Sequence, residues 1–226
     1  MLSKRFPGRE SYPGDIFFAH AGLLERAGNF HHPEKKQVSI TSLPIANIVE
    51  GDITGYISTN LMGMTDGHIL FDADIYNKGF RPAINIPISV TRVGRQTQNK
   101  LLRKITVEIL SILSKFEKVQ NISHLGTELS DDSKKILQKG KAVETILHQE
   151  QMIIPREIQL ILFGVIWLSL ADFSIRKNFE TFLAKILELY KNPEFQKQAN
   201  ELILSDSIAQ LLTKIKNNSS ITALCN

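Results

Sequence analysis

The stretch "ISVTRVGRQTQ", residues 88–98, lies where the sequence changes from short β-type runs to long helical patterns. It places Arg92 in a strand pattern that is otherwise made of apolar and hydroxyl-bearing residues, with Gly94 two positions later. A guanidinium group in a half-buried strand is costly unless it meets a negative partner. The sequence therefore raises the question of what Arg92 binds.

The sequence before this point favours short elements. Residues 1–93 hold most of the prolines and glycines, and they contain the β-rich runs "QVSITSLPI", "GHILFD" and "AINIPISV". The segment "GDIFFAHAGLLERAG", residues 14–28, instead predicts a helix with Asp15 as its N-cap and Gly28 as its stop. His20 lies on the apolar stripe of this helix, and we interpret it as a hydrogen-bonded core histidine rather than a ligand.

The sequence after this point is helical in pattern. Residues 94–226 predict five or six helices in an antiparallel bundle, with Ser130 or Asp131, Pro155 and Asn192 at helix starts. The uncharged segment "IQLILFGVIWLSLA" is shorter than the roughly 20 residues that a bilayer crossing needs, so we predict a buried core helix. The final segment "NNSSITALCN" is predicted to be disordered.

Composition narrows the possible functions. The 226 residues include 27 basic and 23 acidic side chains, a net charge of +4, and the lysines are spread along the chain. This pattern does not predict nucleic-acid binding. The single cysteine, Cys225, excludes an internal disulfide, suits a reducing compartment and is expected to be inert. The amino-terminal "MLSKRFPGRE" lacks the apolar run of a secretory signal or a membrane anchor.

No self-contained active site can be assembled from the sequence. The phosphate-loop pattern G-x-x-x-x-G-K-[ST] is absent, and the pair Gly140-Lys141 lies in a helical pattern without the other required residues. His31 and His32 are adjacent beside Pro33, and neither has the spacing of a metal-ligand set. We therefore predict no metal site in this chain.

Four turn-bound motifs are more specific: "GRESYPGD", "TNLMGMTDGHI", "GFRPAINIPISVTRVG" and "LHQEQ". In this order and at this spacing they resemble the alpha subunit of the F-type rotary ATP synthase, from just after its acidic metal-binding strand to its carboxyl end. "GRESYPGD" and "SVTRVG" favour alpha over the homologous beta subunit. The resemblance implies an α/β plus all-α fold. Residues 1–93 would be the carboxyl part of a P-loop-type, parallel-sheet nucleotide-binding domain, and residues 94–226 the carboxyl-terminal helical domain.

The resemblance implies a role for Arg92. In the family the matching arginine crosses the subunit interface into the catalytic nucleotide site of a beta subunit, where it meets the phosphates as an arginine finger. Ser89 matches a serine that the family needs for activity, and strand alternation places it on the face opposite Arg92. We expect Ser89 to fix the strand and so to aim the arginine. A salt bridge from Arg92 to a carboxylate of the same chain is the alternative.

The resemblance also implies contacts in the alpha subunit's own non-catalytic nucleotide pocket. An aromatic face, a proline edge and amide hydrogen bonds suit adenine. The residues that would surround the base are Tyr76, Arg81, Pro82, Gln149 and Gln151.

The sequence departs from the family pattern at three places near these sites. After Gln151, "MIIP" replaces a usual Tyr-x-Pro-Met, and Gly63 stands where the family has a serine close to the interface phosphates. Ala21-Gly22 replaces a usual Ser-Arg. The change after Gln151 affects the loop expected to contact the base. The changes at Gly63 and Ala21-Gly22 remove polar groups near the arginine, so the assembly role is the stronger expectation.

Cofactors and partners follow from the resemblance. ATP or ADP with Mg²⁺ is expected at the beta interface, and in the non-catalytic site if a separate amino-terminal alpha half completes the fold. The isolated chain is expected to bind neither the nucleotide nor Mg²⁺, because the family's β-barrel domain, P-loop and Mg²⁺-positioning strand lie outside it. The expected partners are beta subunits in an alternating ring, the gamma subunit of the central stalk and such an amino-terminal half, without nucleic acid.

The implied function is that of a regulatory, non-catalytic subunit in proton-driven ATP synthesis or hydrolysis. Its place would be peripheral, at the cytoplasmic face of a bacterial plasma membrane or at an organelle inner membrane, with membrane contact only through the complex. A split-gene product, a partial sequence and a pseudogene fragment all remain open. The alternative function is a stand-alone interaction or decoy protein with no role in turnover.

Overall fold

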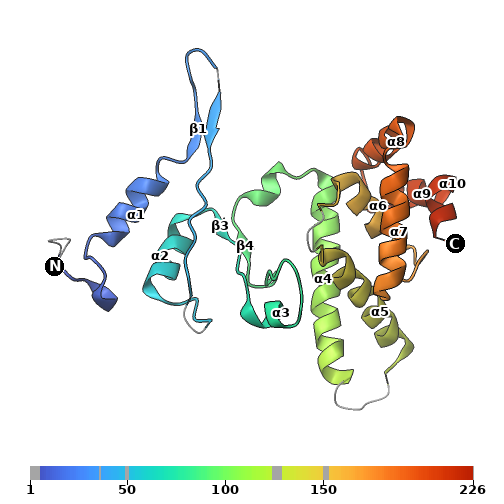
Figure 1. Ribbon diagram of the computed structural model, residues 1–226, viewed down its shortest axis with the longest axis horizontal. Coiled ribbons are helices and arrows are strands. Elements are labelled where there is room, and N and C mark those ends of the chain that lie inside the picture. The colour runs from blue at the N-terminus through green and yellow to red at the C-terminus, as the bar shows by residue number, and fades with distance from the viewer. Residues whose placement is uncertain (1–5, 36, 49–50, 124–128, 150–152, 226) are drawn as a thin grey trace. The chain divides into compact units, whose positions relative to one another are not determined.

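The computed structural model describes residues 6–35, 37–48, 51–123, 129–149 and 153–225 (Figure 1). The chain divides into two compact units. The first consists of Met1–Asp74 with Ile84–Gly94, and the second of Ile75–Ala83 with Arg95–Asn226. The loop around Arg81 therefore belongs with the carboxyl-terminal helices, although it lies between two segments of the first unit in sequence.

The first unit consists of short helices and two small antiparallel sheets. Its helical elements are η1 (Arg9–Ser11), α1 (Ile16–Leu24) and α2 (Tyr56–Met64), of which α1 and α2 contact each other. Strand β1 (Gly28–Phe30) pairs with β2 (Val38–Ile40), and β3 (Gly67–His68) pairs with β4 (Val90–Thr91). In the second pair, Gly67 lies opposite Thr91. The short helix α3 (Ala73–Asn77) leads out of this unit.

The strand pairing differs from the sequence expectation. Both named pairs in the described part of the chain are antiparallel, so the parallel sheet that the resemblance implies for residues 1–93 is not found there. Parallel sheets are stable when helices cover both of their faces. Here α1 and α2 contain no buried residue, and the strands are exposed or only half-buried. Nothing within the described part of this unit can bury a parallel sheet.

Helix α1 confirms the helix predicted for residues 14–28, but it ends at Leu24. Asp15 is the N-cap residue and makes no side-chain cap hydrogen bond. The expected apolar stripe is not buried, since Leu23 remains 60% exposed. His20 is half-buried, and its Nδ1 has no hydrogen-bond partner in the described structure, so its interpretation as a hydrogen-bonded core histidine is wrong.

The second unit is a helical bundle. After the 3-10 turn η2 (Gly94–Thr97), the described residues form seven α-helices rather than the five or six expected. They are α4 (Lys100–Ser123), α5 (Asp131–Leu147), α6 (Arg156–Trp167), α7 (Arg176–Leu189), α8 (Pro193–Ile203), α9 (Ile208–Asn217) and α10 (Ser219–Leu224).

Three predicted helix starts are confirmed. The Ser130 hydroxyl caps α5 by accepting a hydrogen bond from the backbone N–H of Ser133, and Pro155 stands directly before α6. The Asn192 side chain caps α8 by accepting from the backbone N–H of Glu194. A side-chain oxygen at the N-cap satisfies a backbone donor that the helix itself leaves unpaired, which is why Ser130 and Asn192 mark helix starts. Pro155 makes no side-chain cap hydrogen bond.

The core of the second unit surrounds α6. Its residues Ile158, Ile161 and Val165 have no exposed surface, and the helix contacts α5, α8 and α9. This confirms the buried core helix predicted for this segment. No helix in the described part of the chain is both long and apolar enough to cross a membrane. Helices α4 and α5 lie side by side (Figure 1), and the ring of Phe116 on α4 packs against Gly140 on α5.

The carboxyl-terminal segment is ordered, so the predicted disorder is wrong. The Asn218 side chain accepts from the backbone N–H of Ile221 and caps α10, while the Ile221 side chain is only 1% exposed. An N-cap and one apolar anchor stabilise this last turn. Cys225 follows the helix, and burial raises the pKa of its thiol. A raised thiol pKa disfavours the reactive thiolate, which supports the expected inert thiol.

Replacement of Gly140 by alanine is expected to destabilise the bundle. A Cβ at this position would lie 2.3 Å from Cγ of Phe116, at the base of a buried ring. Alanine favours a helix over glycine by about 1 kcal/mol, but overpacking a core costs about 1–3 kcal/mol, and here the clash involves the fixed part of the ring. We therefore expect Gly140→Ala to lower the free energy of unfolding in urea titrations. Lys135→Ala, at an exposed position of α5, should change it by less than about 0.5 kcal/mol. A Gly140→Ala protein more stable than wild type would contradict this packing.

Candidate functional site

Arg92 is held at the end of β4 by backbone groups. Its N–H donates to the carbonyl oxygen of Asp66 at 2.8 Å and so extends the β3–β4 ladder. Its guanidinium donates through Nη2 to the carbonyl oxygen of Met62 at 3.0 Å and through Nη1 to that of Gly63 at 3.4 Å. These acceptors belong to the last turn of α2, where the helix dipole favours a cation.

The Arg92 side chain is exposed, and no carboxylate in the described part of the chain forms an ion pair with it. The alternative of an internal salt bridge is therefore not found there. Neutral carbonyl groups orient a guanidinium without cancelling its full charge. A guanidinium has five donor N–H groups, so donors remain for an external anion.

Two glycines near Arg92 have different roles. At Gly67, a Cβ would lie 2.4 Å from the carbonyl oxygen of Val90, so the close approach of β3 and β4 requires glycine. At Gly63, a Cβ would meet no atom within 4 Å, so the family's serine would be sterically accommodated. The lack of a hydroxyl at Gly63 is thus a chemical difference rather than a packing requirement, and the Gly63 backbone oxygen contacts Arg92 instead.

Ser89 fixes the chain that leads into Arg92. Its hydroxyl donates to the carbonyl oxygen of Asn85 at 2.7 Å and accepts from the backbone N–H of Leu70 at 3.1 Å. The Asn85 side chain in turn donates to Asp72 Oδ2 at 2.8 Å. Ser89 therefore joins the segment after β3 to the segment before β4, which suits a positioning role.

The second group of expected site residues lies on the loop from Tyr76 to Pro82. The guanidinium carbon of Arg81 lies 3.5 Å from the centroid of the Tyr76 ring, in cation–π geometry. Nη1 of Arg81 also donates to the carbonyl oxygens of Tyr76 at 2.9 Å and Phe80 at 2.8 Å. Arg81 thus covers one face of the ring, and a flat ligand would have to stack on the other face or on the guanidinium plane.

The end of α5 meets this loop. The backbone N–H of Gln149 donates to the carbonyl oxygen of Arg81 at 2.9 Å, and the backbone N–H of Arg81 donates to Nδ1 of His148 at 2.9 Å. Pro82 follows Arg81 and is exposed. The structure therefore brings Tyr76, Arg81, Pro82 and Gln149 together, while Gln151 lies outside the described residues.

His148 is the site residue that the sequence analysis missed. It stands directly before Gln149 in the motif "LHQEQ", but only the glutamines were assigned from the motif. Besides its bond to Arg81, its ring contacts that of Phe80 edge to face, with centroids 5.8 Å apart and an interplanar angle of 88°. The only indication in the sequence was that His148 stands beside Gln149. Its contact with Arg81 forms only in the folded chain and could not be predicted from the sequence.

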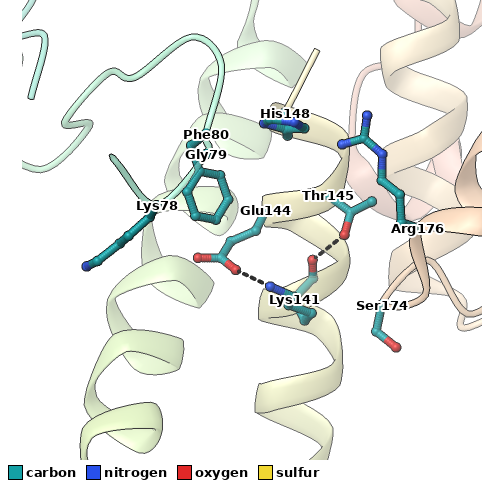
Figure 2. Close-up of a pocket in the computed structure, with 9 residues that line it drawn as sticks. All are labelled: Lys78, Gly79, Phe80, Lys141, Glu144, Thr145, His148, Ser174 and Arg176. Atoms are coloured by element: carbon teal, nitrogen blue, oxygen red, sulfur yellow. Dashed lines mark hydrogen bonds and ion pairs between the residues drawn. The ribbon is translucent and has the colours of Figure 1, made fainter. Parts of the chain in front are cut away.

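A pocket of about 200 Å³ adjoins the same loop (Figure 2). Figure 2 shows α5 forming one wall and the Arg176 guanidinium extending from α7 toward the side where His148 lies. Lys141 and Glu144 on α5 form an ion pair at 3.2 Å. The lining residues are Lys78, Gly79, Phe80, Lys141, Glu144, Thr145, His148, Ser174 and Arg176.

A hydrogen-bonded turn supports the wall of this pocket at Ser174. The Ser174 hydroxyl donates to Asp172 Oδ1 at 2.5 Å, and the Ser174 backbone N–H donates to the same oxygen at 3.0 Å. The hydroxyl hydrogen bond is the main cause that holds the pKa of Asp172 below its ordinary value, against the opposing effect of burial. A depressed carboxyl pKa means that the folded state favours the charged form of Asp172.

The stabilisation from Asp172 should therefore depend on pH. Because its pKa is lower in the folded chain, its contribution is present above the unfolded pKa and is lost as pH falls through the folded one. We expect Asp172→Ala to lower the urea midpoint of unfolding at pH 7 and to lower it by a smaller amount at pH 3. Ser174→Ala should reproduce most of the loss at pH 7. An Asp172→Ala effect of equal size at both pH values would contradict the assignment.

Two family models match the chain in tandem. Residues 1–91 match the nucleotide-binding domain of the ATP synthase alpha/beta family, and residues 98–221 match the C-terminal domain of the ATP synthase alpha/beta chain. The chain is thus similar, from one end to the other, to two domains in the order that the motifs predict.

Curated relatives give the same result. ATP synthase subunit alpha of Clostridium botulinum (strain Alaska E43 / Type E3) is 38% identical over 213 residues, which cover 92% of this chain and 42% of the relative. The subunit alpha of Clostridium acetobutylicum is 35% identical, with coverages of 96% and 44%. That of Wigglesworthia glossinidia brevipalpis is 34% identical, with coverages of 96% and 46%. The chain spans less than half the length of these relatives.

Proposed function

This chain belongs to the ATP synthase alpha/beta family, and we propose that it acts as the carboxyl part of a non-catalytic alpha subunit in a rotary ATP synthase. The expected resemblance to alpha subunits is confirmed by the relatives. In the proposed function, Arg92 reaches the phosphates of a nucleotide that a neighbouring beta subunit holds. The observation that carries the proposal is an exposed guanidinium oriented by neutral carbonyl oxygens, without a carboxylate partner in the described chain.

The chemistry proposed for Arg92 is charge stabilisation. During phosphoryl transfer, negative charge spreads over the oxygens of the transferring group, and a fixed arginine lowers the energy of that state. The two bonds to the end of α2 restrict the guanidinium before a partner arrives. Ser89 holds the backbone that leads into Arg92, so it is proposed as a positioning residue.

The loop from Tyr76 to Pro82, with Gln149 and Gln151, is proposed to contact the adenine of a second, non-catalytic nucleotide. Its support is an exposed surface that combines the Tyr76 ring, the stacked Arg81 guanidinium and the edge of Pro82. Flat aromatic and guanidinium faces stack well on a base. The proposed contacts are to the base, and none of these residues is assigned to the phosphates.

The ligands proposed for both sites are ATP or ADP with Mg²⁺. When bound, Mg²⁺ neutralises charge on the phosphate oxygens. The described residues contain no group of three or more His, Cys, Asp or Glu side chains that could hold a metal ion. We assign none of the described residues to that ion.

The proposed partners are beta subunits, the gamma subunit and an amino-terminal alpha half. Large apolar side chains of the first unit support a covering partner, because Phe6, Leu43 and Ile45 are 90%, 82% and 93% exposed. The proposed location is the cytoplasmic face of a proton-coupling membrane, reached through the complex. A stand-alone interaction or decoy protein is the second candidate, since the same apolar surface would favour binding without turnover.

Replacement of Arg92 tests the arginine finger. In a complex reconstituted with beta and gamma subunits and an amino-terminal alpha half, we expect Arg92→Ala to reduce ATP hydrolysis by about 10³- to 10⁵-fold. Arg92→Lys should remain strongly impaired, because lysine lacks the planar fork of donors. Arg103→Ala, an exposed position on α4, is the matched control and should keep the wild-type rate. Equal hydrolysis by Arg92→Ala and wild type would remove Arg92 from the site and favour the decoy.

Replacement of Ser89 tests the positioning role. Ser89→Phe is expected to lower hydrolysis in the assembled complex while the subunit still folds and assembles, because a ring cannot replace the bonds to Leu70 and Asn85. Circular dichroism and gel filtration of the complex measure folding and assembly alongside the rate. Ser39→Phe, at an exposed position of β2, should leave the rate unchanged. Normal turnover by Ser89→Phe would exclude the role.

A further inference from the structure

One histidine joins the two segments that form the adenine surface. His148 lies at the end of α5, and its Nδ1 accepts a hydrogen bond from the backbone N–H of Arg81, 67 residues earlier in the sequence. The return bond runs from the backbone N–H of Gln149 to the carbonyl oxygen of Arg81 at 2.9 Å. The N–H and the C=O of Arg81 are thus both bound by this short segment.

The bond from Arg81 requires a particular form of the imidazole. Nδ1 can accept a hydrogen bond only when the ring is neutral and its proton is on Nε2. A protonated ring carries N–H at both nitrogens, so the Arg81 amide would face another donor instead of an acceptor. Histidine is also the side chain that ordinarily changes charge between pH 5 and pH 8.

We propose that His148 is a positioning residue of the adenine surface, and that it holds Arg81 in place only as a neutral imidazole. When the ring gains a proton, the Arg81 N–H loses its acceptor, so one of the two hydrogen bonds that tie the Arg81 backbone to the end of α5 is lost and the loop from Tyr76 to Pro82 is held less firmly. This proposal rests on the proposed adenine site. It adds a pH-dependent control of that site.

The loop geometry explains why one amide matters for several contacts. The Arg81 side chain stacks on Tyr76 and donates to the carbonyl oxygens of Tyr76 and Phe80, so the side chain and its backbone are fixed as one unit. The Phe80 ring packs edge to face on the His148 ring. Movement of Arg81 away from His148 would therefore displace the stacked pair and the adjoining Pro82.

Other charged residues line the pocket with His148 or contact it through the backbone. Lys78 on the loop, Lys141 and Glu144 on α5, and Arg176 at the start of α7 share the pocket, and Arg81 contacts the imidazole through its backbone N–H. Lysine, arginine and glutamate ordinarily titrate outside the range from pH 5 to pH 8. A change in the Arg81 contact within this range that disappears on replacement of His148 can therefore be assigned to the histidine.

Amide hydrogen exchange on the full chain tests the hydrogen bond without any nucleotide. After correction for the intrinsic exchange rate, we expect the Arg81 amide of the wild type to lose roughly fivefold protection between pH 7.5 and pH 5.5, in line with a bond of about 1 kcal/mol. His148→Asn keeps an acceptor near the position of Nδ1 and does not titrate, so it should be protected at both pH values. His148→Phe keeps a ring against Phe80 without an acceptor and should be unprotected at both.

Two exchange results would overturn the proposal: equal wild-type protection at both pH values, or the same loss in His148→Asn. A second measurement separates this proposal from the proposed function. In the reconstituted complex, ADP binding at the non-catalytic site should weaken from pH 7.5 to pH 5.5 in the wild type and less in His148→Asn. No ADP binding by any variant at either pH would overturn the adenine site and with it the positioning role. The exchange result would still decide whether neutral His148 holds Arg81.

Discussion

The guanidinium of Arg92 is oriented by carbonyl oxygens of α2, and no carboxylate in the described chain pairs with it. The kind of partner determines whether the charge of Arg92 remains available to an anion outside the chain. A carboxylate would neutralise the charge and keep the side chain within its own chain. Carbonyl groups restrict its direction and leave most of its charge for an external anion. The β3–β4 pair, with glycine at position 67, brings the backbone of Arg92 to that helix end.

Several helix boundaries and the core helix of the second unit could be predicted from short stretches of sequence. Ser130 and Asn192 were recognisable as caps, and the uncharged run around Ile161 was long enough for a core helix but too short for a membrane span. Helix α10 could also have been found, because Asn218 and Ile221 supply a cap and an apolar anchor. It was missed because the polar composition of the tail received more weight than these two residues.

The first unit was harder to predict because its pairing is not a local property. Short apolar runs have the same sequence signature in parallel and antiparallel strands, and the choice depends on what covers them. Leu43 and Ile45 remain exposed in the chain by itself. The motifs predicted the residues of the two candidate sites, but the hydrogen bond between Arg81 and His148 could not be predicted from them. That link forms across 67 residues, through one ring nitrogen and one amide.

The position of Cys225 has a practical consequence. It is the sole thiol of the sequence, and it lies against the last turn of α10, with its Sγ 3.4 Å from the carbonyl oxygen of Ile221. The half-buried thiol is less reactive in the folded chain than after this end has opened, because burial raises its pKa, and the sequence contains no competing sulfhydryl group. The rate at which Cys225 is alkylated in native buffer therefore reports how often the last turn of α10 opens.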